Sequence, residues 1–385
     1  MIKHVVIGHL WNPEGSEELS FGWRALQRQL PKSAQVVHTQ ATTMEALWLE
    51  AKALLSPHVT SENLNGNVLL LAHPHLMLAP QSSVALENGI ATSGSDAICW
   101  AYDSNHTHNS DSIEYCTWRG LERYAASKLS ATELLRINGI HSGVLVGLTS
   151  LATLKTAMPF EQLIHWQVPS AFAHNFSDYH SGSRSEVIHM VPKASLKVLD
   201  VGGGNGGFLK ALKDSHNCET HLAEQSAQSC EVAQPHVDKV WQGDFFSTPI
   251  SEKFDCITFL DVLEHTTEPL RWLERARGLL AGNGSIVASI PNVGHWSVIA
   301  DLLEGRWDYA PVGIHCITHL RFFTRHSIEA LFDEAGLEIE AIEATRVEPP
   351  PWWHTSELSA ATSNALNIQD DNLSAYAFLV RAKLK

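Results

Sequence analysis

The sequence lacks the features that mark several large classes of protein. Its 385 residues contain 27 Lys and Arg against 42 Asp and Glu, which gives a formal net charge of −15. Because no basic excess is present, we expect neither a nucleic acid nor a membrane as a partner. No apolar run approaches the ~20 residues that span a bilayer. The first fifteen residues do not have the layout of a signal peptide.

Cysteine is also sparse, and its spacing excludes two further classes. The six cysteines form no CxxC pair, so neither a zinc ribbon nor a disulfide framework is indicated. Scattered single thiols are typical of a cytoplasmic protein, which is the localisation that we expect. The chain also has no internal repeat and no low-complexity run.

What is present suits two globular domains of the α/β class. The composition is 44% hydrophobic and 18% charged, and 385 residues are too many for one typical domain. We predict an α/β N-terminal domain over 1–173, a linker over 174–195 and a second α/β domain over 196–385. In the N-terminal domain, apolar runs predict strands near 4–10, 34–39, 67–73, 96–102 and 141–148, and 44–55 is typical of a helix.

The second domain alternates apolar runs with helical patterns, as a parallel sheet covered on both faces does. Strands are predicted over 197–201, 219–224, 237–244, 254–261 and 285–292, with a helix over 268–284 before the last of them. A helix over 324–336 has Thr324 as its predicted N-cap. Residues 337–345 and 374–384 are expected to form a closing strand pair.

The most informative stretch is LKVLDVGGGNGGFLKAL, Leu196–Leu212, in which five glycines follow an apolar run within six residues. Glycines between a strand and a helix let a ligand approach the backbone closely, although such a turn can also be a plain hinge. No Gly-Lys-Ser/Thr follows, which excludes a P-loop. Glu224, about 20 residues on, suits the ribose of a dinucleotide or of S-adenosylmethionine. Asp200 would repel a pyrophosphate and attract an ammonium group, so S-adenosylmethionine is favoured.

Further motifs follow in order, and together they resemble a known family. VLDVGGGNGGF, Glu224, GDF (243–245), LDVLEHTTEPL (260–270) and THLRFFTRHSIEALFDEAGL (318–337) are similar to the class I S-adenosylmethionine-dependent methyltransferases. The similarity is to the small-molecule branch that includes ubiquinone-type and sugar or polysaccharide O-methyltransferases. It covers the chain from about Tyr179 onward and implies a seven-stranded, mostly parallel Rossmann-like sheet.

The resemblance also implies the residues that bind the cofactor. Gly202 and Gly204 would approach its methionine and ribose, Glu224 with Gln225 would hold the ribose, and Asp244 with Phe245 would hold the adenine. Near the methionine end it places the remaining candidates: Tyr179, Arg184, Asp200 and Asp261.

Histidines beside these motifs are candidates for the base that an oxygen nucleophile needs. His265, His295 and His319 are all expected on loops at the carboxyl side of the sheet, where each could instead only satisfy buried backbone groups. Asp261, Glu264 and His265 have helical spacing, and similar clusters in ubiquinone-type enzymes hold a divalent cation. Acids in a first helical turn are also ordinary complements of the helix dipole, and we expect no metal.

The N-terminal domain resembles the central part of type A glycosyltransferases, with one departure. Those enzymes hold a metal and a sugar diphosphate with an Asp-x-Asp, whereas this chain has Ala72-His73-Pro74-His75. The departure puts transferase activity in doubt and suggests a glycan-binding or dimerisation module, so a homodimer is a further expectation. A purely structural Rossmann-like domain explains the same residues.

The combined prediction is an S-adenosylmethionine-dependent methyltransferase that acts on a small molecule. A hydroxyl acceptor on a sugar or polysaccharide unit is favoured over a quinone-like phenol, and an amine or a carboxylate is the alternative acceptor. A non-catalytic binding or scaffold protein and a dinucleotide oxidoreductase are the competing classes.

Overall fold

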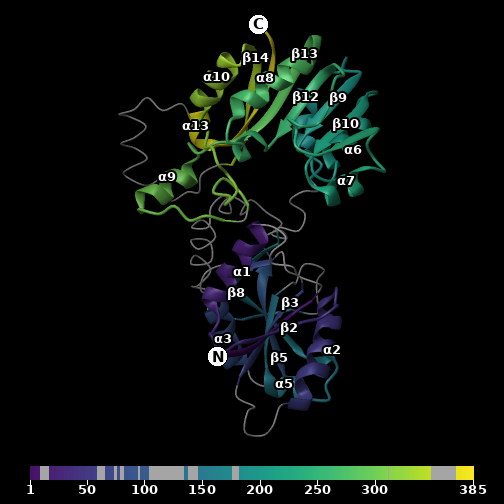
Figure 1. Ribbon diagram of the computed structural model, residues 1–385. Coiled ribbons are helices and arrows are strands. Elements are labelled where there is room, and N and C mark those ends of the chain that lie inside the picture. Colours follow the sequence, from purple (N-terminus) through teal and green to yellow (C-terminus); the bar gives the residue numbers. More distant parts are fainter. Residues whose placement is uncertain are drawn as a thin grey trace. The chain divides into compact units, whose positions relative to one another are not determined.

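The computed structural model describes residues 1–8, 17–58, 66–72, 76–78, 82–93, 96–103, 134–137, 146–175, 182–310, 312–347 and 370–385. They form two compact units (Figure 1). The N-terminal unit is Met1–Ser177 with Asp308–Ile317, and the C-terminal unit is Asp178–Trp307 with Thr318–Lys385. Within the described ranges, every helix is too short or too polar to span a lipid bilayer.

The N-terminal unit is built on an eight-stranded mixed sheet with the order β2-β1-β3-β7-β5-β8-β4, and β6 pairs with β8. Its strands are β1 (Ile2–Ile7), β2 (Gln35–His38), β3 (Asn67–Leu71), β4 (Leu76–Leu78), β5 (Ala97–Asp103), β6 (Leu135–Arg136), β7 (Val146–Ser150) and β8 (Ile164–Asn175). Its described helices are α1 (Glu17–Gln29), α2 (Met44–Leu55), η1 (Ser56–His58), α3 (Ser82–Ser93), α5 (Leu151–Lys155) and η4 (Phe160–Gln162). The predicted α/β class is confirmed.

Successive residues of the central strands pack into two different cores, one on each face of this sheet. Val5 and Leu69 belong to the cluster that contains Leu86 of α3, whereas Val6 and Leu70 belong to the cluster that contains Trp48 of α2. Because neighbouring side chains of a strand point to opposite faces, a strand buried on both faces must be apolar throughout. This is why NVLLL has no polar alternation.

The C-terminal unit contains the expected seven-stranded sheet, in the order β11-β10-β9-β12-β13-β15-β14. Its strands are β9 (Lys197–Val201), β10 (Glu219–Glu224), β11 (Lys239–Gln242), β12 (Phe254–Leu260), β13 (Leu280–Pro291), β14 (Leu337–Arg346) and β15 (Ala375–Leu384). Its described helices are η6 (Ser185–Met190), α6 (Gly207–Lys213), α7 (Ala227–Ala233), η7 (Leu263–His265), α8 (Pro269–Leu279), α9 (Trp296–Leu303), α10 (Arg325–Glu334) and α13 (Asp370–Ser374). Six strands run in one direction, and β15 runs antiparallel to both of its neighbours, β13 and β14.

Two boundaries differ from the sequence prediction. Helix α8 ends at Leu279, and β13 begins at Leu280 instead of Ser285. The predicted helix extended to Gly284, but its last four residues, AGNG, contain two glycines and an asparagine, which are weak helix formers, and they belong to the strand. The predicted linker is also partly structured, since His174 and Asn175 lie in β8 and Val187 and Met190 of η6 are buried in a core of the C-terminal unit. Thr324 caps α10 through the predicted bond, accepting from the backbone N–H of Ser327.

The strand order places the candidate site. From β9 the chain continues to β10 and β11 on one side, while β12 and β13 lie on the other. Open parallel sheets bind ligands at such a reversal, outside the carboxyl ends of the strands. The loops that follow β9, β10 and β12 therefore form the edge on which a ligand is expected.

Candidate functional site

The glycine loop after β9 has a backbone that side chains tolerate poorly. Gly202, Gly204 and Gly206 have φ angles of 73°, 53° and 74°, in the left-handed region that favours glycine. At Gly203 the limit is space, because a Cβ atom there would lie 2.1 Å from Oδ2 of Asp200. The loop is therefore shaped by glycine at each of these positions, which is more than a hinge requires.

This loop forms one wall of a pocket at the carboxyl end of β9. The described residues that line the pocket are Gly182, Arg184, Asp200, Gly202, Gly203, Gly204, Phe208, Leu260 and Asp261. Backbone, one cation and two carboxylates thus face the same space. Three of the predicted cofactor-binding residues that are not glycine line it, Arg184, Asp200 and Asp261, whereas Tyr179 falls outside the described residues.

Asp200 is buried at the base of this pocket. The side chain is 1% exposed, and its Oδ1 accepts a hydrogen bond of 2.5 Å from Oγ1 of Thr258. Its Oδ2 has no hydrogen-bond partner in the described structure. Burial, reinforced by the charge of Glu224, raises the pKa of Asp200 to about 7, against the effect of the Thr258 bond. An orphaned acid of this kind is suited to a cationic ligand, because a nearby positive charge stabilises the carboxylate.

Arg184 and Asp261 meet across the pocket. Nη1 of Arg184 donates to Oδ2 of Asp261 over 2.5 Å, and its Nε donates to Oε1 of Glu186 over 2.6 Å. Ser289 completes the group: its Oγ accepts from Nη2 of Arg184 and donates to Oδ1 of Asp261, both at 2.8 Å. The sequence analysis did not include Ser289. Its one signal was a serine near the carboxyl end of an apolar strand.

Glu224 and Gln225 lie at the end of β10, next to the glycine loop. The carboxylate of Glu224 accepts the backbone N–H of Gly204 at 3.0 Å and that of Ser226 at 2.7 Å. The side chain is half-buried, and Gln225 is exposed. Glu224 therefore fixes the second strand end to the glycine loop, in the place where the resemblance expects a group for ribose hydroxyls.

Asp244 and Phe245 follow β11 and differ in what they offer a ligand. Asp244 is exposed, and its Oδ1 accepts the backbone N–H groups of Phe246 and Ser247. Phe245 is 3% exposed and packs in the core against Phe259 and Trp272. This burial argues against the expected role of Phe245 as a surface for an adenine ring, because the ring is already covered by protein.

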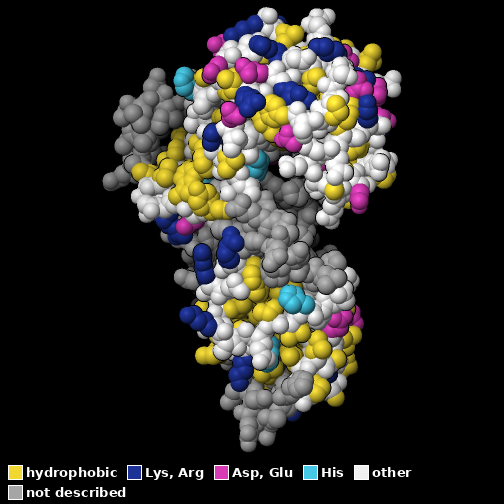
Figure 2. Space-filling view, in the orientation of Figure 1, with side chains coloured by type: hydrophobic (Ala, Val, Ile, Leu, Met, Phe, Trp, Pro, Cys, Tyr) yellow, Lys and Arg dark blue, Asp and Glu magenta, His cyan; other side chains and the backbone are white. Residues whose placement is uncertain are grey.

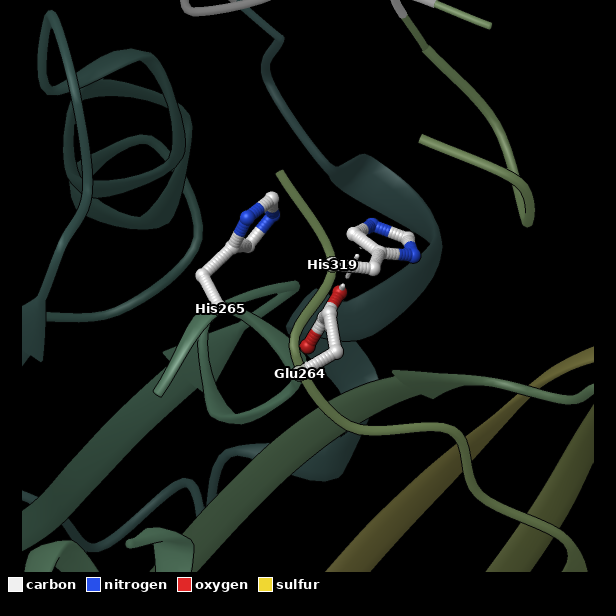
Figure 3. Close-up of side chains that lie close together, drawn as sticks. All are labelled: Glu264, His265 and His319. Carbon is white, nitrogen blue, oxygen red and sulfur yellow. Dashed lines mark ion pairs between the residues drawn. The ribbon is translucent and has the colours of Figure 1, made fainter. Parts of the chain in front are cut away.

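Two of the candidate histidines lie together with Glu264 (Figure 3). His265 in η7 and His319 have ring centroids 4.7 Å apart, and Nε2 of His319 is 4.0 Å from Oε1 of Glu264. Nδ1 of His265 lies 3.2 Å from the carbonyl oxygen of Thr318. A carbonyl only accepts, so this bond places the ring proton on Nδ1 and leaves the basic lone pair on Nε2.

The acid in this group is deeply buried. Glu264 is 1% exposed, and neither oxygen has a hydrogen-bond partner within the described part of the chain. Burial, with the charge of Asp261 added, raises its pKa well above the usual range. One donor atom each from Glu264, His265 and His319 lie within 4.8 Å of one another, so these residues are the described set that a metal ion could use. The predicted cluster had Asp261 in place of His319, but Asp261 pairs with Arg184.

His295 has a structural environment. It is fully buried, precedes α9 as its N-cap, and its Nδ1 lies 2.8 Å from Oγ of Ser297. Burial lowers its pKa to about 4, which makes it a poor proton acceptor at neutral pH. The expectation that His295 is a candidate base is therefore not supported by its position. In the N-terminal unit, His73 and His75 lie outside the described residues.

Comparison with known proteins identifies the family. A family model described as "Methyltransferase domain" matches residues 143–342, slightly more than half of the chain. Among curated relatives, a ubiquinone biosynthesis O-methyltransferase of Cereibacter sphaeroides (strain KD131) is 26% identical over 176 residues, which are 43% of this chain and 70% of that protein. The protein of the same name from Idiomarina loihiensis is 29% identical over 163 residues, 40% of this chain and 66% of its own.

Solved structures were compared as well. A SAM-dependent methyltransferase from Archaeoglobus fulgidus is 18% identical with a TM-score of 0.38, over 54% of this chain and 97% of that one. The mitomycin 7-O-methyltransferase MmcR is 16% identical with a TM-score of 0.37, over 54% of each chain. The family match rests on the sequence model, and the seven-stranded sheet with its glycine loop agrees with it. The chain therefore belongs to the family of methyltransferase domains.

Proposed function

We propose that this methyltransferase moves a methyl group from S-adenosylmethionine to a hydroxyl group of a small molecule. The observation that carries the proposal is the pocket at the carboxyl end of β9. It combines glycine backbone with the orphaned acid Asp200 and the cation Arg184. The names of the curated relatives, which are O-methyltransferases, support an oxygen acceptor.

The residues present fit this cofactor at both of its ends. Asp200 would meet its ammonium group and Arg184 its carboxylate, so that each end of the cofactor would face an opposite charge in the same pocket. Glu224 and Gln225 hold the ribose hydroxyls, and Asp244 accepts from the adenine amino group. When bound, the cofactor supplies a methyl group that is activated by the adjacent sulfonium charge.

His265 is the residue that we assign to proton removal from the acceptor. Its Nδ1–H is held by the carbonyl of Thr318, so Nε2 is the atom that accepts a proton. The ring is half-buried on η7, directly after β12 and therefore on the same edge of the sheet as the pocket. The ring of His319 packs against that of His265, and its Nε2 lies 4.0 Å from Oε1 of Glu264.

The proposed acceptor is defined by its hydroxyl group. The sequence motifs favour a sugar hydroxyl, and the curated relatives are named ubiquinone biosynthesis O-methyltransferases, which favours an oxygen acceptor of either kind. We keep the broader class, a hydroxyl on a small molecule. A cytoplasmic location is supported by the five described cysteines, all of which are free thiols. A homodimer stays a prediction, which light scattering tests.

Calorimetry with S-adenosylhomocysteine and NADH separates the competing functions. We expect micromolar or tighter binding of S-adenosylhomocysteine by the full chain and none of NADH. The reverse result would make the protein a dinucleotide oxidoreductase. Labelled S-adenosylmethionine is then presented with catechols, sugars, amines and carboxylic acids. Transfer to hydroxyl compounds supports the proposal, transfer only to nitrogen or carboxylate corrects the acceptor, and binding without any transfer favours a scaffold protein.

A further inference from the structure

Ser289 has a hydroxyl group whose hydrogen-bonding capacity is directed by its two neighbours. It lies near the carboxyl end of β13 and is fully buried. A guanidinium group only donates and a carboxylate only accepts, so the hydroxyl must accept from Nη2 of Arg184 and donate to Oδ1 of Asp261. Its proton and one lone pair are thereby assigned.

The three side chains form a closed ring of hydrogen bonds. Nη1 of Arg184 binds Oδ2 of Asp261 directly, and Ser289 joins Nη2 to Oδ1 on the other side. The ring connects three segments: the stretch before β9, the turn after β12 and the strand β13. Sheet pairing already brings the turn after β12 to β13, since the backbone N–H of Asp261 donates to the carbonyl of Ser289, and the side-chain ring adds the stretch before β9 to this pair.

The backbone at two corners of the ring is in an unfavourable conformation. Arg184 has φ 46° and Asp261 has φ 56°, a region that residues with a side chain seldom occupy. Such conformations persist where surrounding contacts determine them, and they are concentrated at binding sites. Here the contacts of both side chains include Ser289, which does not line the pocket itself.

We infer that Ser289 is a positioning residue that holds Arg184 in place for a carboxylate in the pocket. Arg184 is the one cationic side chain among the described residues that line this pocket. Without the hydroxyl, Nη2 of Arg184 loses its buried partner, and the guanidinium group keeps only its bonds to Asp261 and to the exposed Glu186. The inference rests on the proposed function, in which that carboxylate is the amino-acid end of S-adenosylmethionine.

The test compares two ligands that share a nucleoside and differ in the amino-acid end. S-Adenosylhomocysteine carries the carboxylate, and 5′-methylthioadenosine lacks it. For Ser289→Ala in the full chain we expect calorimetry to show S-adenosylhomocysteine binding weakened by about tenfold or more, because bonds to charged groups are the strong ones. Binding of 5′-methylthioadenosine should be unchanged.

Ser289→Thr keeps the hydroxyl group and should restore most of the lost affinity. Ser285→Ala is the matched control, since Ser285 is also buried and lies on the same face of β13, four residues from Ser289 and away from the pocket. It should bind both ligands as the wild type does. If thermal melting shows that Ser289→Ala is unfolded, Ser289→Cys keeps the size with a weaker donor and should show the same selective loss.

The outcomes separate this inference from the proposed function. If the wild type binds neither ligand, the proposed function fails. If the wild type binds both and a Ser289 variant weakens both equally, or weakens neither, the cofactor site stands and the positioning role is overturned. Selective loss for the ligand that carries a carboxylate supports it.

Discussion

The two units of this chain are built in the same way but differ at the ends of their strands. In both, the central parallel strands are largely apolar and buried, as β3 and β9 are. In the N-terminal unit, β1, β2 and β3 are followed by Gly8, Thr39 and Ala72, none of which is charged, and β5, which runs in the same direction, ends in a single acid, Asp103. In the C-terminal unit, β9 contains Asp200, β10 ends in Glu224 and β12 is followed by Asp261. In each unit the apolar strands form the core of the fold. In the C-terminal unit, the three acids at the carboxyl edge of the sheet distinguish the edge that carries the candidate site.

This comparison predicts different effects for two histidines, one in each unit: a loss of activity at one and a loss of stability at the other. His265 lies at the charged edge, and His265→Ala should lower kcat by about 10²- to 10⁴-fold, the usual contribution of a general base. The affinity for S-adenosylhomocysteine should stay as in the wild type. Steady-state kinetics and calorimetry measure the two quantities, and full activity would remove the proposed base.

His165 provides the control in the other unit. Its Nδ1 accepts from Nε1 of Trp100, and its Nε2 lies 3.1 Å from the carbonyl of Phe160. His165→Gln should therefore lower the melting temperature and leave kcat unchanged. Treatment with a chelator tests whether the enzyme needs a metal ion, and we expect no loss of activity. A loss that divalent ions restore would make Glu264, His265 and His319 a metal centre instead.

A pair of tightly packed glycines gives the next largest effect. A Cβ atom at Gly203 would meet Oδ2 of Asp200 at 2.1 Å, and one at Gly8 would meet the carbonyl oxygen of Ala41 at 2.4 Å. Both alanine variants should be less stable by roughly 1–3 kcal/mol, the usual cost of overpacking. Only Gly203→Ala should also weaken S-adenosylhomocysteine binding, by at least about tenfold. Equal affinities in the two variants would mean that the glycine loop is only a hinge.

Much of this arrangement followed from the sequence, and what did not follow has a common cause. The strands, the Thr324 cap and the glycine loop depend on residues close in the chain, so local patterns predicted them. The bonds of Arg184 to Asp261 and Ser289 join residues 77 and 105 positions apart. Which distant segments meet depends on the strand order, and no local pattern contains that information.

The orientation of single side chains was also beyond the sequence. Phe245 follows Asp244 in a motif that the sequence resemblance assigned to adenine, yet its ring packs into the core. His295 had the same signal as His265, a histidine after a strand end, but it caps a helix. Both residue types suit a ligand and a buried neighbour equally well, so only the surrounding structure separates the two roles.

Asp244→Ala should have a moderate effect, limited to binding. The exposed carboxylate is assigned to the adenine amino group, and loss of one hydrogen bond to a charged group weakens affinity by about tenfold. The rate with saturating S-adenosylmethionine should change less than the affinity does. Unchanged affinity would leave Asp244 with only its bonds to Phe246 and Ser247, as the cap of the turn after β11.

The pH dependence of cofactor binding tests the role of Asp200, the acid near the carboxyl end of β9, which has no counterpart at β1, β2 or β3. The pKa of Asp200 is raised to about 7 by burial, so the empty pocket holds a neutral acid at low pH and a carboxylate at high pH. A ligand ammonium group favours the carboxylate, and S-adenosylhomocysteine affinity should therefore rise as pH increases toward 7 and level off above it. The slope below pH 7 is at most about tenfold per pH unit.

The free energy of unfolding of the ligand-free protein should change with pH in the opposite direction to the cofactor affinity. The ordinary pKa of the group is 3.8, so between that value and about 7 the folded chain binds a proton that the unfolded chain has lost. The free energy of unfolding contributed by Asp200 must then fall as pH rises through this window. Asp200→Asn, which cannot titrate, should flatten both profiles. If the variant keeps the wild-type pH dependence of binding, another group is responsible, and the difference between the two units does not reside in this acid.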